Sequence, residues 1–307
     1  MISTTLNNLM SLTSTNTLWV VLGPTAIGKT ALGIQLAQKL NTEIISCDSR
    51  QFFQEMRIGT AVPSAEELDS VPQHFIQHIS IHQEYSVGSF EKESLKKLEE
   101  LFKTKQHAVL VGGSGLYIDA VCKGLDNFPA INPTLRKKLR NKYNKFGIVW
   151  LQKEVEKNDP EYYQNADIQN AHRLLRCLEV CLQSHNTFTS FRQQKTNRRP
   201  FDIKYIGLQI PREKLYRQIN QRVDNMMQEG LLEEVKALLP YQHLNALQTV
   251  GYRELFTHLN GEHTLERAVE LIKQNTRRFA KRQLTWLKRY EETQWFDSAE
   301  KALERIQ

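Results

Sequence analysis

Eight residues near the start of the chain have the types and spacing of a phosphate-binding loop. They read GPTAIGKT, and the pattern G-x-x-x-x-G-K-[ST] is met by Gly23, Gly28, Lys29 and Thr30. Glycines let backbone N–H groups turn inward around an anion, and a helix that begins at the loop adds partial positive charge. The lysine reaches the terminal phosphate, and the threonine hydroxyl suits Mg²⁺. The loop predicts a site for a diphosphate without indicating which molecule carries it.

A carboxylate, Asp48, follows the next apolar run of the chain, Ile44-Ile45-Ser46-Cys47. Loops after the strands of a parallel sheet are where α/β enzymes place their working groups. The run is only partly apolar, which weakens the pattern expected before a Mg²⁺-binding carboxylate. The spacing leaves three roles open for Asp48: a Mg²⁺ ligand, a general base, or a residue that caps a turn.

The turn GGSGLY, residues 112–117, offers a hydroxyl group at Ser114 and an aromatic ring at Tyr117. A serine in this position ordinarily caps the helix that follows. The residues alone therefore favour a cap, with contact to a ligand as the alternative.

A basic stretch, residues 273–290, holds seven Lys or Arg and no acidic residue, with Phe279 and Trp286 among them. Cations neutralise RNA phosphates and aromatic rings stack on exposed bases, whereas a solvated helix normally mixes charges of both signs. The stretch indicates a nucleic-acid partner, and a solvated helix with buried aromatic residues is the alternative.

Strands and helices alternate around these residues. Apolar runs and helical periodicity predict strands over 17–22, 42–47 and 107–111, and helices over 29–40 and 89–106. This order predicts an α/β fold, a parallel sheet like that of P-loop NTPases with helices on both faces. The loops at the strand ends would form the site.

The character of the sequence changes near Lys123, where LDNFPAINP begins a basic and mostly helical stretch. Residues 123–204 hold 16 Lys and Arg against 8 Asp and Glu. We therefore expect three parts: a first core part over 1–122, a helical insertion domain over 123–203, and a second core part over 204–307. In the last part we expect a strand over 204–210 and long helices over 212–239 and 264–290.

Composition sets outer bounds on the function. The 307 residues carry a net charge of +7, a mild indication of a polyanionic partner. No run approaches the roughly 18 apolar residues of a membrane helix, and residues 1–17 lack the features of a signal peptide, so we expect a cytoplasmic protein. The four cysteines form no CxxC pair, and buried reduced thiols are the expected state.

Several blocks together resemble the tRNA dimethylallyltransferases, also called tRNA isopentenyltransferases. The resemblance covers about residues 17–297, and the joint occurrence of the blocks is far more specific than the phosphate loop alone. The blocks are GPTAIGKT, DSRQFFQEMRIGTAVPS, GGSGLY, NAHRLLRCLEV, RVDNMMQEGLLEEV, TVGYREL and TRRFAKRQLTW.

The resemblance implies transfer of a dimethylallyl group from dimethylallyl diphosphate to N6 of adenosine 37 in tRNA, releasing diphosphate. Asp48 would be the general base, and Lys29, Arg222 and Mg²⁺ held by Thr30 would stabilise the leaving group. Ser114 stands where the family usually has threonine, and it keeps the hydroxyl group. The residues implied around the diphosphate are Gly23, Pro24, Thr25, Ala26, Ile27, Gly28, Lys29 and Thr30.

The resemblance also implies how tRNA is bound. The insertion domain would hold the anticodon stem-loop, and the target base would be flipped out of the loop. We expect a monomer. The residues implied in tRNA binding are Asp48, Ser49, Arg50, Gln51, Ser114, Asn170, Arg173, Thr249, Val250, Gly251, Tyr252, Arg253, Glu254, Arg278, Lys281 and Arg282.

Two other functions are alternatives to this one. A P-loop kinase acting on a small molecule would use the same loop for ATP and Asp48 to deprotonate an alcohol, but it gives the basic stretches no purpose. A non-catalytic RNA-binding protein would have no need of Lys29, Thr30 and Asp48 together. Local departures from the family pattern, such as PQHFIQH over 72–78, affect single contacts and leave the expected reaction unchanged.

Overall fold

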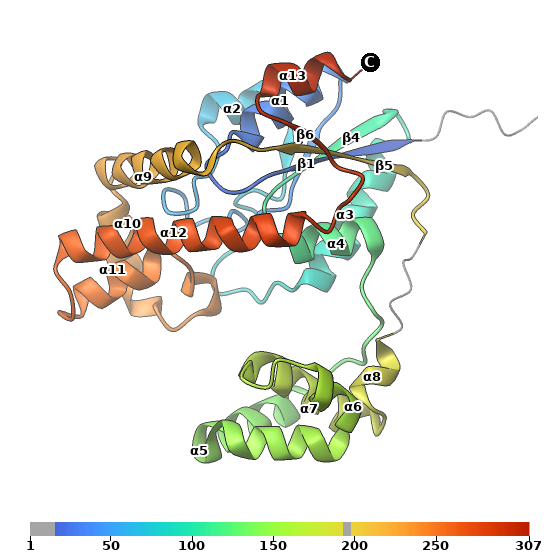
Figure 1. Ribbon diagram of the computed structural model, residues 1–307, viewed down its shortest axis with the longest axis vertical. Coiled ribbons are helices and arrows are strands. Elements are labelled where there is room, and N and C mark those ends of the chain that lie inside the picture. The colour runs from blue at the N-terminus through green and yellow to red at the C-terminus, as the bar shows by residue number, and fades with distance from the viewer. Residues whose placement is uncertain (1–15, 193–197, 307) are drawn as a thin grey trace, which may run out of the picture. The chain divides into compact units, whose positions relative to one another are not determined.

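The computed structural model describes residues 16–192 and 198–306. The chain forms two compact units, which are treated separately here (Figure 1). The first unit contains the chain up to Lys123 and again from Arg199, and the second contains Gly124–Arg198.

A six-stranded parallel sheet forms the centre of the first unit, in the order β3-β2-β4-β1-β5-β6. Its central strands are continuous apolar runs, as expected of parallel strands that are buried on both faces. The expected strand over 204–210 begins two residues earlier. The strands are β1 (Thr17–Leu22), β2 (Ile44–Ser46), β3 (Gln73–His74), β4 (His107–Val111), β5 (Asp202–Leu208) and β6 (Gln294–Phe296).

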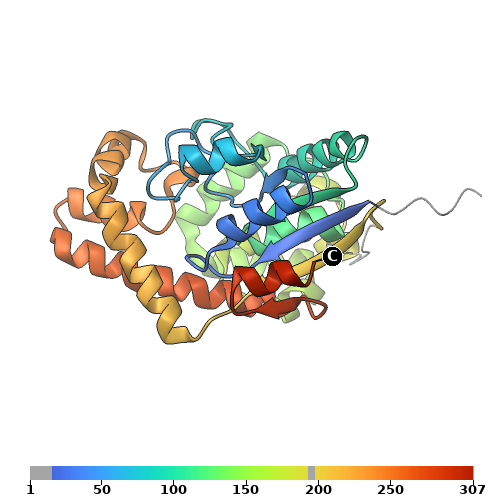
Figure 2. The same ribbon diagram turned by 90° about the horizontal axis from the view of Figure 1, so that it is seen from above.

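Side chains of β1 alternate between two hydrophobic cores. Leu18, Val20 and Leu22 pack into one core with α3 (Val87–Leu101) and α4 (Gly115–Lys123), whereas Trp19 and Val21 pack into the other with α1 (Lys29–Lys39) and α13 (Ala299–Glu304). Because successive strand residues point to opposite faces, these two pairs of helices cover the two faces of the sheet (Figures 1 and 2).

The remaining helices of the first unit follow β2 and β5. Most of the basic stretch lies on α12, but this helix ends at Leu287, three residues before the expected end at 290, so Lys288 and Arg289 follow it. In the described part of the chain, no helix has both the length and the apolar character that a membrane span needs. These helices are α2 (Ala65–Ser70), α9 (Arg212–Gln228), α10 (Leu231–Leu238), α11 (Tyr252–Leu259) and α12 (Leu265–Leu287).

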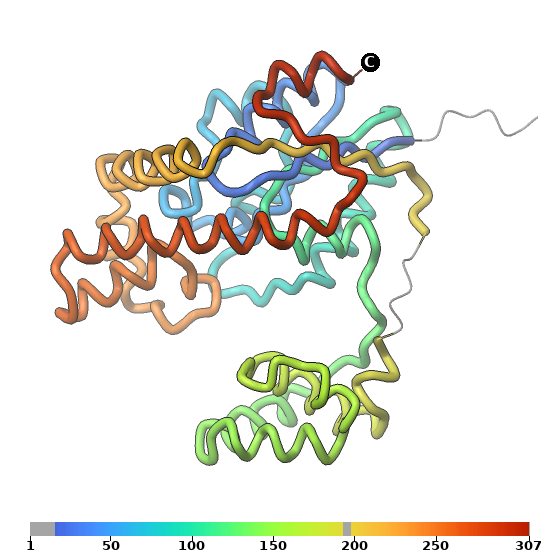
Figure 3. The backbone as a smooth tube through the Cα atoms, in the orientation of Figure 1, coloured from blue at the N-terminus to red at the C-terminus, as the bar shows by residue number. Residues whose placement is uncertain are grey.

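The single helix expected over 212–239 is wrong, because the segment forms α9 and α10 as two helices (Figure 3). Gly230 lies between them with φ of 101°, a left-handed conformation that glycine adopts at little cost. The chain changes direction there, so α9 can pack on α12 while α10 packs on α11.

The second unit consists of α5 (Pro133–Asn158), α6 (Pro160–Asn165), α7 (Ala171–Ser184) and α8 (Phe188–Phe191). Gly147 has non-helical backbone angles and divides α5 into two helical segments. Cys177 and Cys181 of α7 lie in the core of this unit as free thiols, and their Sγ atoms are 4.0 Å apart.

Candidate active site

The phosphate-binding loop connects β1 to α1. Gly28 precedes α1 with φ of 98°, and no described side chain caps the amino end of this helix, so its first N–H groups are available to an anion. The Lys29 ammonium group donates a hydrogen bond to the backbone oxygen of Pro24 at 2.8 Å. This geometry is a preformed anion cradle.

Lys29, the one cationic residue of the loop, has a pKa well below its ordinary value. Burial lowers its pKa to about 8, the Asp48 carboxylate opposes this change, and the Arg222 guanidinium lowers the pKa further. Loss of hydration disfavours the charged form of an amine, and an arriving anion favours that form. Lys29 is therefore set to gain positive character when phosphate is bound.

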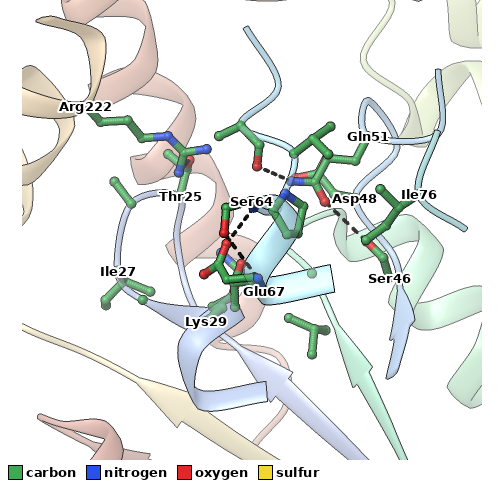
Figure 4. A pocket seen from close by; sticks show the side chains of 18 of the residues that line it. Thr25, Ile27, Lys29, Ser46, Asp48, Gln51, Ser64, Glu67, Ile76 and Arg222 are labelled. Carbon is green, nitrogen blue, oxygen red and sulfur yellow. Dashed lines mark hydrogen bonds between the residues drawn. The ribbon is translucent and has the colours of Figure 1, made fainter. Parts of the chain in front are cut away.

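A cavity of about 810 Å³ opens over this loop (Figure 4). The phosphate loop forms one side of it, and Asp48, Gln51 and Arg222 reach it from other elements. The segment 57–64 contributes further lining, much of it apolar. One cavity thus combines cationic groups for a diphosphate with apolar surface for a hydrocarbon.

A second cavity, of about 550 Å³, lies beside the first. It is lined by Ser49, Ser114 and Tyr117 and by the aromatic side chains Phe279 and Trp286 of α12. Both cavities share the lining residues Thr25, Asp48, Arg222, Met226 and Gln283. Two ligands could therefore occupy neighbouring cavities and meet beside Asp48.

Asp48 caps its own turn, because its Oδ1 accepts a hydrogen bond from the N–H of Arg50 at 3.1 Å. No other hydrogen bond to this carboxylate is found among the described residues. The capping role considered from the sequence is thus present, and it leaves carboxylate lone pairs able to accept a proton.

Arg222 reaches the same region from α9. Its Nη1 lies 3.5 Å from the hydroxyl oxygen of Thr25, at the limit of a hydrogen bond. Burial lowers the pKa of the guanidinium, and the charge of Asp48 opposes this change. No acidic side chain among the described residues is in hydrogen-bond contact with this partly buried guanidinium, so it is suited to bind an incoming anion.

Ser114 connects two loops at the strand ends. Its hydroxyl group accepts a hydrogen bond from the N–H of Ser49 and donates one to the Ser49 hydroxyl, each at 3.2 Å. Ser114 therefore ties the turn after β4 to the turn after β2 and remains part of the second cavity wall.

Gln283 is a site residue that the sequence reasoning missed. Its side chain is only 7% exposed, its Oε1 accepts the N–H of Thr25 at 2.9 Å, and its Nε2 donates to the oxygen of Gly113 at 2.9 Å. A Cβ atom at Gly113 would lie 2.2 Å from Nε2, so the approach requires glycine there. In the sequence, Gln283 is one neutral residue within TRRFAKRQLTW, a block whose positive charges indicate RNA binding. Its amide therefore gives only a weak signal of a role in the site.

The prediction that Tyr252 and Glu254 of TVGYREL contact RNA stays a prediction, and in this structure both side chains have partners inside the protein. Tyr252 is fully buried and donates its hydroxyl hydrogen to Glu234 at 2.6 Å. Glu254 is 6% exposed and accepts hydrogen bonds from Gly251 N–H and the Asn275 amide. Both support the preceding turn from inside. Four others of the block line the second cavity: Thr249, Val250, Gly251 and Arg253.

Two residues of DSRQ also have partners within the chain. The Arg50 guanidinium donates to the backbone oxygens of Asn245 and Ala246 at 2.9 and 2.8 Å, and Arg50 is also among the residues that line the second cavity. Gln51 is buried and lines the first cavity rather than the second.

Among the predicted basic residues, Arg278, Lys281 and Arg282 are exposed on α12. Arg282 lines the second cavity together with Phe279. Asn170 and Arg173 belong to the second unit, where the Asn170 side chain caps α7 by accepting the N–H of Arg173 at 3.2 Å. Arg173 is exposed there.

Oxygen-bearing side chains suited to a hard cation are found in the first cavity, which is lined by Thr30, Asp48 and Glu67. Elsewhere in the described residues, Asp159 lies with Cys177 and Cys181 in a buried group. There the Asp159 carboxylate already accepts three hydrogen bonds, from Tyr162 and Thr189, so its oxygens are largely occupied.

Comparison with known proteins gives consistent matches. The model of the IPP transferase family matches residues 51–290. A tRNA dimethylallyltransferase of Flavobacterium johnsoniae is 56% identical over 283 residues, covering 90% of this chain and 92% of the relative. The tRNA dimethylallyltransferase 1 of Bacteroides thetaiotaomicron is 45% identical, covering 91% of each chain.

Solved structures resemble the chain as well. The tRNA isopentenylpyrophosphate transferase of Bacillus halodurans has a TM-score of 0.69 and 34% sequence identity, covering 94% of each chain. A eukaryotic dimethylallyltransferase acting on tRNA has a TM-score of 0.75 and 27% identity, covering 89% of this chain and 70% of that one.

Proposed function

The chain belongs to the IPP transferase family and transfers a dimethylallyl group to tRNA, and on that premise we propose that the donor is dimethylallyl diphosphate and the acceptor N6 of adenosine 37. The observation that carries this proposal is the pair of cavities that share Asp48 and Arg222. One cavity suits a diphosphate with a hydrocarbon tail, and the other suits a base.

The donor would bind with its diphosphate in the cradle of residues 23–30. The N–H groups at the start of α1 and the ammonium group of Lys29 would bind the phosphate oxygens. The short hydrocarbon would lie against the apolar lining of the first cavity, so that its far end points away from the phosphate loop. This arrangement would hold C1 near the residues that the two cavities share.

The acceptor adenine would enter the second cavity. A base stacked within the anticodon loop cannot reach a cavity, so it would be flipped out and received by aromatic surfaces such as Tyr117, Phe279 and Trp286. The basic side chains of α12, Arg282 among them, would contact neighbouring phosphates. The target nitrogen would then lie beside Asp48.

In the reaction, the bond between C1 and the bridging oxygen breaks while a bond between N6 and C1 forms. The lone pair of an exocyclic adenine amine is delocalised into the ring, so the nitrogen gains nucleophilicity only as its proton is removed. Asp48 accepts that proton, and diphosphate leaves with the electrons of the broken bond. Lys29 and Arg222 stabilise the negative charge that develops on the bridging oxygen.

The donor set of the first cavity fits Mg²⁺, since hydroxyl and carboxylate oxygens with phosphate are the ligands this ion prefers. The Thr30 hydroxyl would hold the ion, with the Asp48 and Glu67 carboxylates in the same cavity. When bound, Mg²⁺ would neutralise charge on the leaving diphosphate. We propose further that the protein acts as a monomer, because residues of one chain provide both a donor cavity and an acceptor cavity. We propose the cytoplasm as its location, because the family acts on tRNA.

A labelling experiment tests the proposal. The protein is incubated with radiolabelled dimethylallyl diphosphate and unmodified tRNA, and in parallel with labelled ATP and candidate alcohols. We expect label on adenosine 37 alone, lost when that base is replaced by guanosine. Turnover of ATP without prenylated tRNA would support a kinase instead and overturn the assignment of the donor.

A further inference from the structure

A single carboxylate, Glu234 of α10, holds the backbone of the loop that forms one wall of the first cavity. Its Oε2 accepts the N–H groups of Arg57 and Ile58 at 3.0 and 2.7 Å, and its Oε1 accepts the N–H of Gly59 at 3.0 Å. Three successive N–H groups converging on one carboxylate form a strong, charge-assisted clamp.

The fourth partner of this carboxylate is the buried hydroxyl group of Tyr252, at 2.6 Å from Oε1. The loop lies directly on this ring, because a Cβ atom at Gly59 would be 2.5 Å from Cε2 of Tyr252. Glycine at position 59 is therefore required for the loop to reach the clamp.

A second clamp of opposite polarity holds the other half of the loop. The Gln51 amide nitrogen donates to the backbone oxygens of Thr60 and Ala61 at 3.2 and 2.8 Å. Ala61 has φ of 49°, a left-handed conformation that costs free energy in any residue with a Cβ atom. The loop is thus held in a conformation that it would not adopt without these bonds.

The clamped loop presents apolar side chains to the cavity. Ile58, Ala61, Val62 and Pro63 all line it, together with Arg57 of the same segment. A hydrocarbon prefers such a surface, whereas a bare diphosphate has no interaction to gain from it.

We propose that Glu234 is a positioning residue. By fixing residues 57–63, it sets the length of the donor's hydrocarbon chain that the first cavity accepts. The inference rests on the proposed function, since it takes the first cavity as the site of a prenyl diphosphate. Glu234 contacts no part of the donor itself. Its effect on the reaction is to keep the wall at the depth that accepts a five-carbon chain and excludes a longer one.

The test compares three ligands in calorimetric titrations of the whole protein: inorganic pyrophosphate and the thiolo-diphosphate analogues of the dimethylallyl and geranyl donors. The variant Glu234→Gln places an amide NH₂ group against backbone N–H groups and so breaks part of the clamp. Glu233→Gln is the matched control, because Glu233 is the adjacent residue, is exposed, and forms an ion pair with Lys236 at the surface and with no other side chain of the described residues. Both variants lose one negative charge.

In the wild type we expect the dimethylallyl analogue to bind at least about tenfold more tightly than the geranyl analogue. Glu234→Gln should lower the affinity for the dimethylallyl analogue by about tenfold, so that the affinities for the two analogues differ by no more than about threefold. Its affinity for pyrophosphate should stay within about twofold of the wild-type value. Glu233→Gln should match the wild type with all three ligands.

The inference is overturned if Glu234→Gln keeps the wild-type preference between the two analogues, or weakens pyrophosphate as much as the dimethylallyl analogue. If that variant does not fold, Tyr252→Phe decides the question, because it removes only one of the four hydrogen bonds. In Tyr252→Phe, the ratio of the affinities for the dimethylallyl and geranyl analogues should fall by about twofold or more. An unchanged ratio would contradict the inference. A wild-type protein that binds neither pyrophosphate nor either analogue would refute the proposed donor site itself.

Discussion

The buried side chain of Gln283 accepts a hydrogen bond from the backbone N–H of Thr25 at 2.9 Å, across a sequence separation of 258 residues. The helix whose charge indicates RNA binding is thereby attached to the loop whose glycines indicate phosphate binding. The same amide donates to Gly113, so one side chain of α12 connects two loops that are distant from it in the sequence.

This relationship predicts a large effect of a neutral substitution. Gln283→Leu leaves the Thr25 N–H and the Gly113 oxygen without their buried partner, at a cost of about 1–3 kcal/mol each. We expect kcat/KM for the donor to fall by about 10–100-fold while tRNA affinity changes little. Steady-state kinetics with varied donor and filter binding of tRNA measure the two quantities.

Two variants sharpen the result for Gln283. Thr285→Ala changes an exposed residue of the same helix, so its kcat/KM and tRNA affinity should equal those of the wild type. Gln283→Glu keeps the acceptor for Thr25 but turns a carboxylate oxygen toward the Gly113 carbonyl, so its activity should lie between those of the other two. Equal activity of Gln283→Leu and Thr285→Ala would show that the bridge has no role in the reaction.

Asp48→Asn should separate the capping role from the proton-accepting role. Asparagine can still accept the Arg50 N–H, so the turn is kept, but its amide cannot take a proton from N6. We expect single-turnover prenylation to slow by about 10²–10⁴-fold. Donor-analogue and tRNA affinities should stay within a few fold of wild type. Asp69→Asn, an exposed site on α2, serves as the control. A near-normal rate in Asp48→Asn would remove it as the base.

Donor binding should depend on pH through Lys29. Burial lowers the pKa of this ammonium group to about 8, so the neutral amine becomes the main form of the free protein above that pH. A bound diphosphate favours the charged form, so binding above pH 8 requires uptake of a proton. Affinity for the dimethylallyl thiolo-diphosphate should be level between pH 6.5 and 7.5 and fall by several fold between pH 8 and pH 9.

The matched variant for this pH profile is Lys29→Arg. A guanidinium stays protonated throughout this range, so its affinity, even if lower, should not fall between pH 8 and pH 9. Calorimetry in buffers of different ionisation enthalpy would report the proton uptake in the wild type and its loss in the variant. The same decline in both proteins would assign the pH dependence to another group.

The local parts of this fold could be predicted from the sequence, because their signals are local. The run Thr17–Leu22 and the loop that ends at Thr30 gave the first strand, turn and helix within a residue. The break at Gly230 was missed because helical periodicity continues on both sides of it. A glycine between two periodic segments signals a possible end of a helix but does not require one.

The site was predictable only where chemistry follows residue type. Lys29, Asp48 and Arg222 are charged residues whose roles follow from the resemblance to a family. In the structure all three line one cavity. The burial of Tyr252 depends on the distant Glu234 side chain and on the backbone of Gly59, and the bridge made by Gln283 depends on backbone groups of Thr25 and Gly113. Backbone groups have no signature in the sequence, so such supporting residues become visible only in the structure.

The face of α12 beside the second cavity should contribute most to tRNA affinity. Arg282 lines that cavity with Phe279 and Trp286, whereas the adjacent and equally exposed Lys281 does not line it, although both were expected to bind tRNA. Arg282→Glu should weaken tRNA binding by about tenfold and reduce the slope of log affinity against log salt by about one. Lys281→Glu, with the same change of charge, should have a clearly smaller effect on both. Filter binding at several salt concentrations measures these slopes. Equal losses of tRNA affinity in the two variants would mean that the net charge of the helix determines this affinity, and not the side of the helix that faces the cavity.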